Sequence, residues 1–249
     1  MKEFNLVVAS SSEESSQKAL ILSKKIKLPF VGSLEYLDKG YRDLATSFLL
    51  VVSEDSIYLK KDLKGTSKPI YCDFIKWSKE NKKSNLVKAL KGLPKKGVII
   101  DATAGLGRDA LVLSSLVKTV ILIERVPWVS VLLEDGLKNS KESLPCLLNT
   151  QVICIESKEY LLNLNSKPDA IYLDPMFENI GRSKAKREVQ ALRDLTIQTN
   201  EEDLLEVALK RAKDRVVVKR HKKAKHLADI KPTFSLEGRV IRYDVYSLN

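Results

Sequence analysis

The chain has 249 residues, 44% of them hydrophobic, which suffices for one large α/β domain or for such a domain with a small extra lobe. Its longest apolar runs fall far short of the roughly 20 residues that cross a bilayer, and its N-terminal apolar stretch is too short for a secretory signal. We therefore expect no membrane-spanning segment and a cytoplasmic location.

Charge and cysteine content limit the choice of partners. Lysine and arginine number 43 against 32 acidic residues, a net charge of +11. This excess favours a polyanionic partner such as nucleic acid, because phosphate contacts release counterions, although a lysine-rich proteome would produce the same bias. The chain has two histidines and three cysteines (Cys72, Cys146 and Cys154) and no CxxC pair. We therefore expect no metal site and no disulfide framework.

The first 95 residues have a mixed pattern of short apolar runs and helical spacing. The predicted elements are, in chain order, a strand at 4–9, a helix at 14–25, a hairpin of strands at 48–53 and 56–60, a short strand at 69–74 and a helix at 85–91. We interpret residues 1–83 as a small N-terminal α/β lobe and residues 84–249 as the main domain.

From residue 97 onward strands and helices alternate, which is typical of a parallel sheet with crossover helices. The predicted strands are 98–101, 119–124, 151–155, 170–173 and 216–219, followed by an antiparallel pair at 233–236 and 239–247. The predicted helices are 108–116, 128–139, 158–162 and 201–213. Seven strands ending in a hairpin match a Rossmann-like class I methyltransferase, with its mostly parallel sheet, better than a dinucleotide-binding dehydrogenase.

A glycine turn follows the first strand of this sheet, in the stretch VIIDATAGLGRDALVL at 98–113. Asp101 ends the strand, and Gly105 and Gly107 lead into a helix, so a nucleotide cofactor can approach the backbone closely. We therefore predict Asp101, Gly105 and Gly107 as cofactor-binding residues. Glu124 closes the next strand, where a carboxylate can accept hydrogen bonds from ribose hydroxyls. The turn also satisfies G-x-G-x-x-A, so these residues alone leave NAD and S-adenosylmethionine both open.

The predicted strand at 170–173 is followed by Asp174, Pro175, Met176 and Phe177. An acidic or amide residue, a proline and then an aromatic residue at this strand end is typical of amino-methyltransferases. A carboxylate and a proline-held carbonyl can accept the two N–H bonds of an exocyclic amine, and an aromatic ring can stack on the base. Asp-Pro is also a common turn. Together with the glycine turn and Glu124, it favours methyl transfer, with Asp174, Pro175 and Phe177 as catalytic residues.

The strings DATAGLGRDA, AIYLDPMF and VVVKR resemble the RsmJ family of bacterial small-subunit rRNA guanine-N2 methyltransferases over about residues 97–249. The resemblance implies S-adenosylmethionine-dependent methylation of the 2-amino group of a guanine in 16S rRNA. It also implies cofactor contacts, which fall on Arg108, Asp109, Glu124, Arg125, Glu156, Ser157 and Asp174. The N-terminal lobe matches this family poorly.

Two basic segments flank the predicted crevice and could contact RNA phosphates. The first contains Arg182, Lys184, Lys186 and Arg187, and the second begins with Lys219 and Arg220. Solvated lysines are the alternative interpretation of both segments.

Three other functions stay open from the residues alone. They are an amino-methyltransferase acting on DNA or another RNA, an NAD-dependent oxidoreductase, and a non-catalytic RNA-binding assembly factor. We expect 16S rRNA or the small ribosomal subunit as partner, while the sequence leaves the oligomeric state undetermined.

Overall fold

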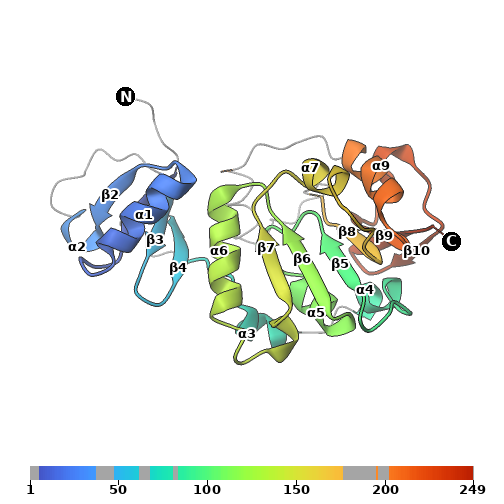
Figure 1. Cartoon of the computed structure of the whole chain (residues 1–249), viewed down its shortest axis with the longest axis horizontal. Coiled ribbons are helices and arrows are strands. Elements are labelled where there is room, and N and C mark those ends of the chain that lie inside the picture. The colour runs from blue at the N-terminus through green and yellow to red at the C-terminus, as the bar shows by residue number, and fades with distance from the viewer. Residues whose placement is uncertain are drawn as a thin grey trace.

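The structure is a computed structural model that describes residues 6–37, 48–61, 68–80, 84–175, 195 and 202–248. It contains a four-stranded sheet in the order β2-β1-β3-β4 and a seven-stranded sheet in the order β10-β11-β9-β8-β5-β6-β7. Figure 1 shows the small sheet on one side of helix α6 (Pro127–Lys138) and the large sheet on the other. None of the helices described is long and apolar enough to cross a membrane.

The small sheet belongs to the N-terminal part of the chain. Its elements are β1 (Leu6–Ser10), α1 (Ser16–Ile26), β2 (Phe30–Ser33), α2 (Leu34–Leu37), β3 (Phe48–Val52) and β4 (Ile57–Lys61). The β3–β4 hairpin is antiparallel, which confirms the predicted hairpin, whereas β1 pairs in parallel with both of its neighbours. Strand β2 and helix α2 are absent from the sequence prediction because four-residue elements carry too few repeats to show a period.

The connection between the sheets differs from its prediction. Instead of a strand at 69–74, only Ile70 pairs, in an isolated bridge with Leu59. The Asp73 carboxylate accepts a hydrogen bond from the Lys76 amide at 2.9 Å and so caps helix α3 (Phe74–Ser78). Capping makes the helix more favourable than a continued strand here. Helix α4 (Ser84–Ala89) follows, and the division of domains after residue 83 stays a prediction.

The large sheet has the architecture expected for a class I methyltransferase. Its strands are β5 (Val98–Asp101), β6 (Thr119–Ile123), β7 (Thr150–Ile153), β8 (Ala170–Leu173), β9 (Arg215–His221), β10 (Phe234–Glu237) and β11 (Ile241–Ser247). The helices beside it are α5 (Ala110–Leu116), α6, α7 (Ser157–Leu162) and α9 (Glu202–Arg211), with short 3-10 turns η1 (Pro145–Leu147) and η2 (Leu227–Asp229). Strand β11 pairs antiparallel with β9 and β10, and the remaining pairs are parallel.

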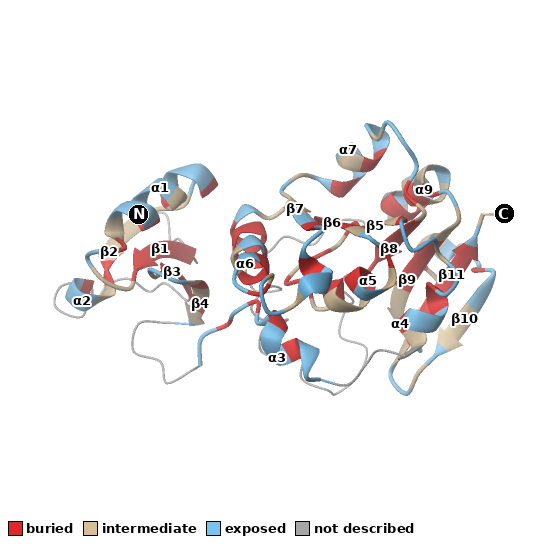
Figure 2. Cartoon of the chain, turned by 60° about the horizontal axis from the view of Figure 1, so that its bottom comes forward, coloured by how far each residue is buried: buried red, intermediate tan, exposed pale blue. Residues whose placement is uncertain are grey.

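Alternating side chains build one apolar layer on each face of the large sheet. Ile99 packs in the layer that contains α4, α5 and α6, whereas Ile100 packs in the layer that contains α7 and α9. This alternation follows from the period of two in a strand. Figure 2 shows the buried residues concentrated along the strands and the inward sides of the helices. The carboxyl ends of β5 and β8, where the strand order reverses, meet at one edge of this core, the usual place for a ligand in such sheets.

Gly107 should tolerate alanine less well than Gly105, although both have positive φ, +75° and +52°. A Cβ at Gly107 would lie 2.5 Å from Leu133 Cδ1 and 2.9 Å from Phe74 Cζ, whereas one at Gly105 would meet nothing within 4 Å. We expect Gly105→Ala to cost about 1–2 kcal/mol of unfolding free energy from backbone strain, and Gly107→Ala about 1–3 kcal/mol more from overpacking. Urea unfolding measures both, and equal losses would contradict this packing argument.

Candidate active site

The turn after β5 is held by a buried carboxylate. Asp101 is 2% exposed, and its Oδ1 accepts a hydrogen bond from the Thr103 amide at 3.0 Å. Burial raises the pKa of Asp101 well above its ordinary value, and the charges of Asp109 and Asp174 add to this, while the Thr103 amide and Lys219 oppose it. Asp101 was predicted among the cofactor-binding residues, and its described contact is with the protein's own turn.

Glu124 joins the glycine turn to the neighbouring strand. Its two carboxylate oxygens accept hydrogen bonds from the Gly105 amide at 3.0 Å and the Val126 amide at 2.7 Å. Burial raises the pKa of Glu124, and these two amides partly oppose that change. A carboxylate oxygen has two lone pairs, so the same side chain has the capacity to accept hydrogen bonds from ribose hydroxyls as well.

Two hydroxyl groups connect the turn to the neighbouring elements. Thr103 Oγ1 accepts a hydrogen bond from the Asp174 amide at 2.5 Å, and Ser157 Oγ donates to the Ala102 carbonyl at 2.5 Å. The sequence analysis did not select Thr103. The pairing of Asp101 with Tyr172 in the β5–β8 register places Thr103 beside Asp174, a relation that only the strand order reveals.

Lys219 lies between two carboxylates at the edge of the sheet. Its Nζ is 2.6 Å from Asp174 Oδ2 and 3.0 Å from Asp109 Oδ2, and Asp109 also accepts a hydrogen bond from the Tyr172 hydroxyl at 2.8 Å. Burial would lower the pKa of Lys219, but the two carboxylates outweigh it and raise the pKa. The ammonium of Lys219 is thus paired with carboxylates inside the protein, and its expected phosphate contact stays a prediction.

The remaining predicted cofactor residues lie around the same edge with different partners. The Arg108 guanidinium stands 4.3 Å from the centre of the Trp77 ring and 3.4 Å from Glu80 Oε2. Arg125 Nε lies 4.0 Å from Glu156 Oε2, and both of these side chains are partly exposed. Arg108 thus anchors helix α3 beside the glycine turn, a contact that the sequence did not indicate.

Several predicted residues fall outside the part of the chain that the structure describes. Among the predicted catalytic residues, Pro175 is within the described part: it follows Asp174 and is buried. Phe177 and the basic residues Arg182, Lys184, Lys186 and Arg187 lie outside the described residues.

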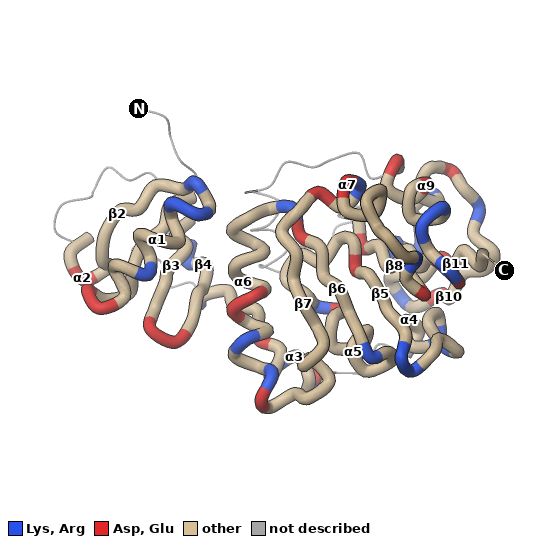
Figure 3. Tube along the Cα trace, viewed as in Figure 1, with Lys and Arg blue, Asp and Glu red and all other residues tan. Residues whose placement is uncertain are grey.

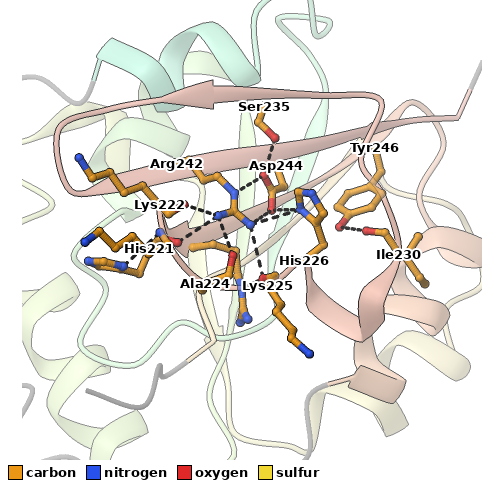
Figure 4. Close-up of polar contacts among 12 residues, drawn as sticks. His221, Lys222, Ala224, Lys225, His226, Ile230, Ser235, Arg242, Asp244 and Tyr246 are labelled. Atoms are coloured by element: carbon orange, nitrogen blue, oxygen red, sulfur yellow. Dashed lines mark hydrogen bonds and ion pairs between the residues drawn. The ribbon is translucent and has the colours of Figure 1, made fainter. Parts of the chain in front are cut away.

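The basic loop, defined here as Lys222–Lys225 after β9, is shaped by a buried arginine (Figure 4). Arg242 is 5% exposed and donates hydrogen bonds to the carbonyls of His221, Lys222, Ala224 and Lys225. Its charge is balanced by Asp244, whose pKa is raised by burial but lowered overall by hydrogen bonds from Arg242, Ser235 and His226. The predicted RNA contact Arg220 also donates to the Lys225 carbonyl, at 3.2 Å.

Replacing Asp101 by asparagine should stabilise the protein in a pH-dependent way. The variant keeps an oxygen for the Thr103 amide but cannot ionise. Because the pKa of Asp101 is raised in the folded state, wild-type stability falls as pH rises above about 4, by up to about 1.4 kcal/mol per pH unit until the folded-state pKa is reached. We therefore expect the advantage of the variant to be smallest in acid and to grow toward neutral pH.

Urea unfolding over a pH series measures this difference, with the exposed residue Asp55 changed to asparagine as a control for loss of one carboxyl. An advantage of Asp101→Asn that stays constant with pH would show that the buried carboxyl does not resist ionisation.

Known proteins are similar to this chain both in sequence and in fold. A family model described as "Putative SAM-dependent methyltransferase" matches residues 38–248. The chain is 35% identical over 255 aligned residues to the ribosomal RNA small subunit methyltransferase J of Coxiella burnetii (strain RSA 331 / Henzerling II), covering 98% of this chain and 97% of that protein. It is 40% identical over 194 residues to the protein of the same name from Nitrosococcus oceani, covering 72% and 76%.

A solved structure agrees with these relatives. The SAM-dependent methyltransferase of Neisseria gonorrhoeae superimposes with a TM-score of 0.71 and 26% sequence identity, over 96% of this chain and 95% of that chain. The predicted class I fold and S-adenosylmethionine as cofactor are thereby confirmed, and the NAD-dependent alternative is wrong. The chain belongs to the SAM-dependent methyltransferases and, within them, to the ribosomal RNA small subunit methyltransferase J family.

Proposed function

We propose that this enzyme methylates the exocyclic 2-amino group of a guanine in 16S rRNA of the small ribosomal subunit, with S-adenosylmethionine as methyl donor. The observation that carries the proposal is Asp174 at the carboxyl edge of β8. Its side chain is 29% exposed, Thr103 holds its amide, Lys219 holds its carboxylate, and Pro175 follows it. The names of relatives that match nearly the whole chain support rRNA as the substrate class.

The residues around the glycine turn fit the cofactor. The space beside Gly105 is open, since a Cβ placed there would have no other atom within 4 Å, and Glu124 stands next to it with spare acceptor capacity. We propose that Glu124, Arg125 and Glu156 contact the cofactor through their side chains, and that the turn at Gly105 and Gly107 contacts it through the backbone. The remaining predicted cofactor residues also have protein partners, and their contacts to the cofactor stay predictions; they are Asp101, Arg108, Asp109, Ser157 and Asp174.

When bound, S-adenosylmethionine supplies an electrophilic methyl group. A guanine amine is a weak nucleophile because its lone pair is conjugated with the base. The Asp174 carboxylate and the Pro175 carbonyl can each accept one N–H of that amine, which turns the lone pair out of conjugation and orients it. After transfer the nitrogen carries a positive charge, and a proton leaves to water or to Asp174. Positioning therefore provides most of the rate enhancement, and no strong base is required.

The basic loop offers a surface for the phosphates of the substrate. Lys222, Lys223 and Lys225 are exposed, and the hydrogen bonds of Arg242 fix the backbone from which they project. This loop follows β9, the strand that also carries Lys219 to the active-site edge. Basic residues lie on both lobes (Figure 3), so we base this assignment on the position and the rigid backbone of the loop.

Changing Asp174 to alanine should abolish methyl transfer while leaving cofactor binding largely intact. Loss of the group that accepts the amine N–H should lower kcat about 100-fold or more, because a positioned acceptor acts mainly in the transition state. The measurement is N2-methylguanosine formed in small subunits from cells that lack the gene, quantified by mass spectrometry. Calorimetric titration with S-adenosylhomocysteine tests cofactor binding.

Asp174→Asn serves as the matched control, since it keeps an acceptor oxygen and should retain more activity than alanine. Normal methylation by Asp174→Ala would contradict the assigned role. Transfer to DNA or large-subunit rRNA at a rate equal to that with small subunits would contradict the proposed substrate.

Neutralising the basic loop should weaken substrate binding without slowing the chemical step. For Lys222→Gln, Lys223→Gln and Lys225→Gln combined, we expect KM for the small subunit to rise while kcat changes little. The slope of log affinity against log salt should fall by about 0.7–0.9 for each phosphate that the variant no longer neutralises. Binding and initial rates over a salt series provide both values.

A control with the same charge change combines Lys91→Gln, Lys95→Gln and Lys96→Gln. These exposed lysines precede β5 and lie at the opposite edge of the sheet. Equal losses in the two triple variants would show that net charge, and not the basic loop, controls binding.

A further inference from the structure

The ammonium of Lys219 connects three elements that meet at the active-site edge. Lys219 is on β9, Asp174 follows β8, and Asp109 precedes α5. The lysine side chain is 17% exposed, and the Asp109 side chain is 3% exposed. Because Asp109 is also bonded to Tyr172, one side of the ammonium is anchored in the core while the other faces the more exposed carboxylate of Asp174.

Several ionisable groups surround this pair. Asp101 from β5 lies close enough to interact with Asp109, Asp174 and Lys219. Tyr243 from β11 pairs with Lys219 in the strand register, and its buried hydroxyl has no hydrogen-bond partner among the residues that the structure describes. The carboxylates of Asp101, Asp109 and Asp174 thus repel one another, which favours protonation of one of them. The positive charge of the Lys219 ammonium opposes that protonation.

We propose that Lys219 is a positioning residue that keeps the Asp174 carboxylate ionised and oriented toward the substrate amine. The proposal rests on the function assigned above and extends it. An ionised carboxylate accepts N–H bonds with both oxygens, whereas a protonated one presents a donor to the same amine. The ion pair between Lys219 and Asp174, at 2.6 Å, therefore selects the protonation state that can bind the amine productively.

A phosphate contact and a purely structural ion pair make different predictions. Loss of a phosphate contact would raise KM and leave the pH profile unchanged. Loss of a structural pair would lower stability without changing the pH dependence of the folded enzyme. Loss of a positioning residue should change kcat and its dependence on pH, because no neighbouring ammonium then keeps the Asp174 carboxylate ionised.

The test is Lys219→Met assayed with small subunits between about pH 5 and about pH 9. Removing the nearby ammonium should move the acid limb of kcat about 1–3 pH units upward relative to wild type. Because an aspartate ordinarily titrates near about pH 4, we expect a loss of about twofold or more at about pH 5, recovered at the alkaline end. KM for the subunit and the affinity for S-adenosylhomocysteine should each change less than about threefold, well below a factor of ten.

Two further variants keep the test decisive. Lys219→Met combined with Asp109→Asn removes the buried carboxylate that would otherwise lack its ammonium, so it protects folding. It should show an upward shift smaller than that of the single variant, because Asp109 no longer repels Asp174. Lys219→Arg retains a cation and should restore a profile close to that of wild type. A folded Lys219→Met or double variant with the wild-type pH profile would overturn the proposal, as would an effect confined to KM.

Failure of this inference can be distinguished from failure of the proposed function. If the wild-type enzyme forms no N2-methylguanosine in small subunits, the function is wrong. If it forms this product and the pH profile of both methionine variants matches that of wild type, only the role of Lys219 is wrong.

Discussion

The burial of charge at the carboxyl edge of β5, β8 and β9 is the constraint on which the candidate active site depends. The register places Asp101 opposite Tyr172 and Leu173 opposite Val218, so Asp174 and Lys219 meet where the strands end. Carboxylates are costly to remove from water unless they are paired or hydrogen-bonded. Lys219 and the hydroxyl of Tyr172 satisfy Asp109, and Asp174 is left partly exposed at the edge of the sheet, where we propose that it contacts the substrate.

The glycine turn owes its shape to the polar groups around it as much as to its glycines. Glu124 binds the Gly105 amide, Asp101 binds the Thr103 amide, and Thr103 accepts from Asp174. These hydrogen bonds, joined through the backbone of the turn between Thr103 and Gly105, link the proposed cofactor side of the site to its proposed substrate side. A small shift at the turn would move the Asp174 carboxylate, for which we propose a catalytic role, and this gives a physical reason for the close packing of Gly107 against Leu133 and Phe74.

The periphery of the site is held by separate ionic anchors. Arg242 and Asp244 organise the basic loop from within β11, and Arg108 ties α3 to the glycine turn through Trp77. The N-terminal lobe is joined to α6 through Asp135, which accepts a hydrogen bond from the Ile57 amide at 2.8 Å. These contacts connect the basic loop, helix α3 and the N-terminal lobe to the elements around the candidate active site.

Local patterns in the sequence determined the succession of seven strands, the β3–β4 hairpin, the glycine turn and the Asp174-Pro175 element, because strand alternation and turn residues act over a few neighbouring positions. They could not show that Asp73 caps a helix in place of a strand, or that Thr103 reaches Asp174. Lys219 illustrates the limit most clearly. In sequence it begins a basic run, but the alternation of β9 turns it to the buried face that carries Val217 and Tyr243. Only the packing of distant strands supplies the carboxylates that make that position favourable for a charge.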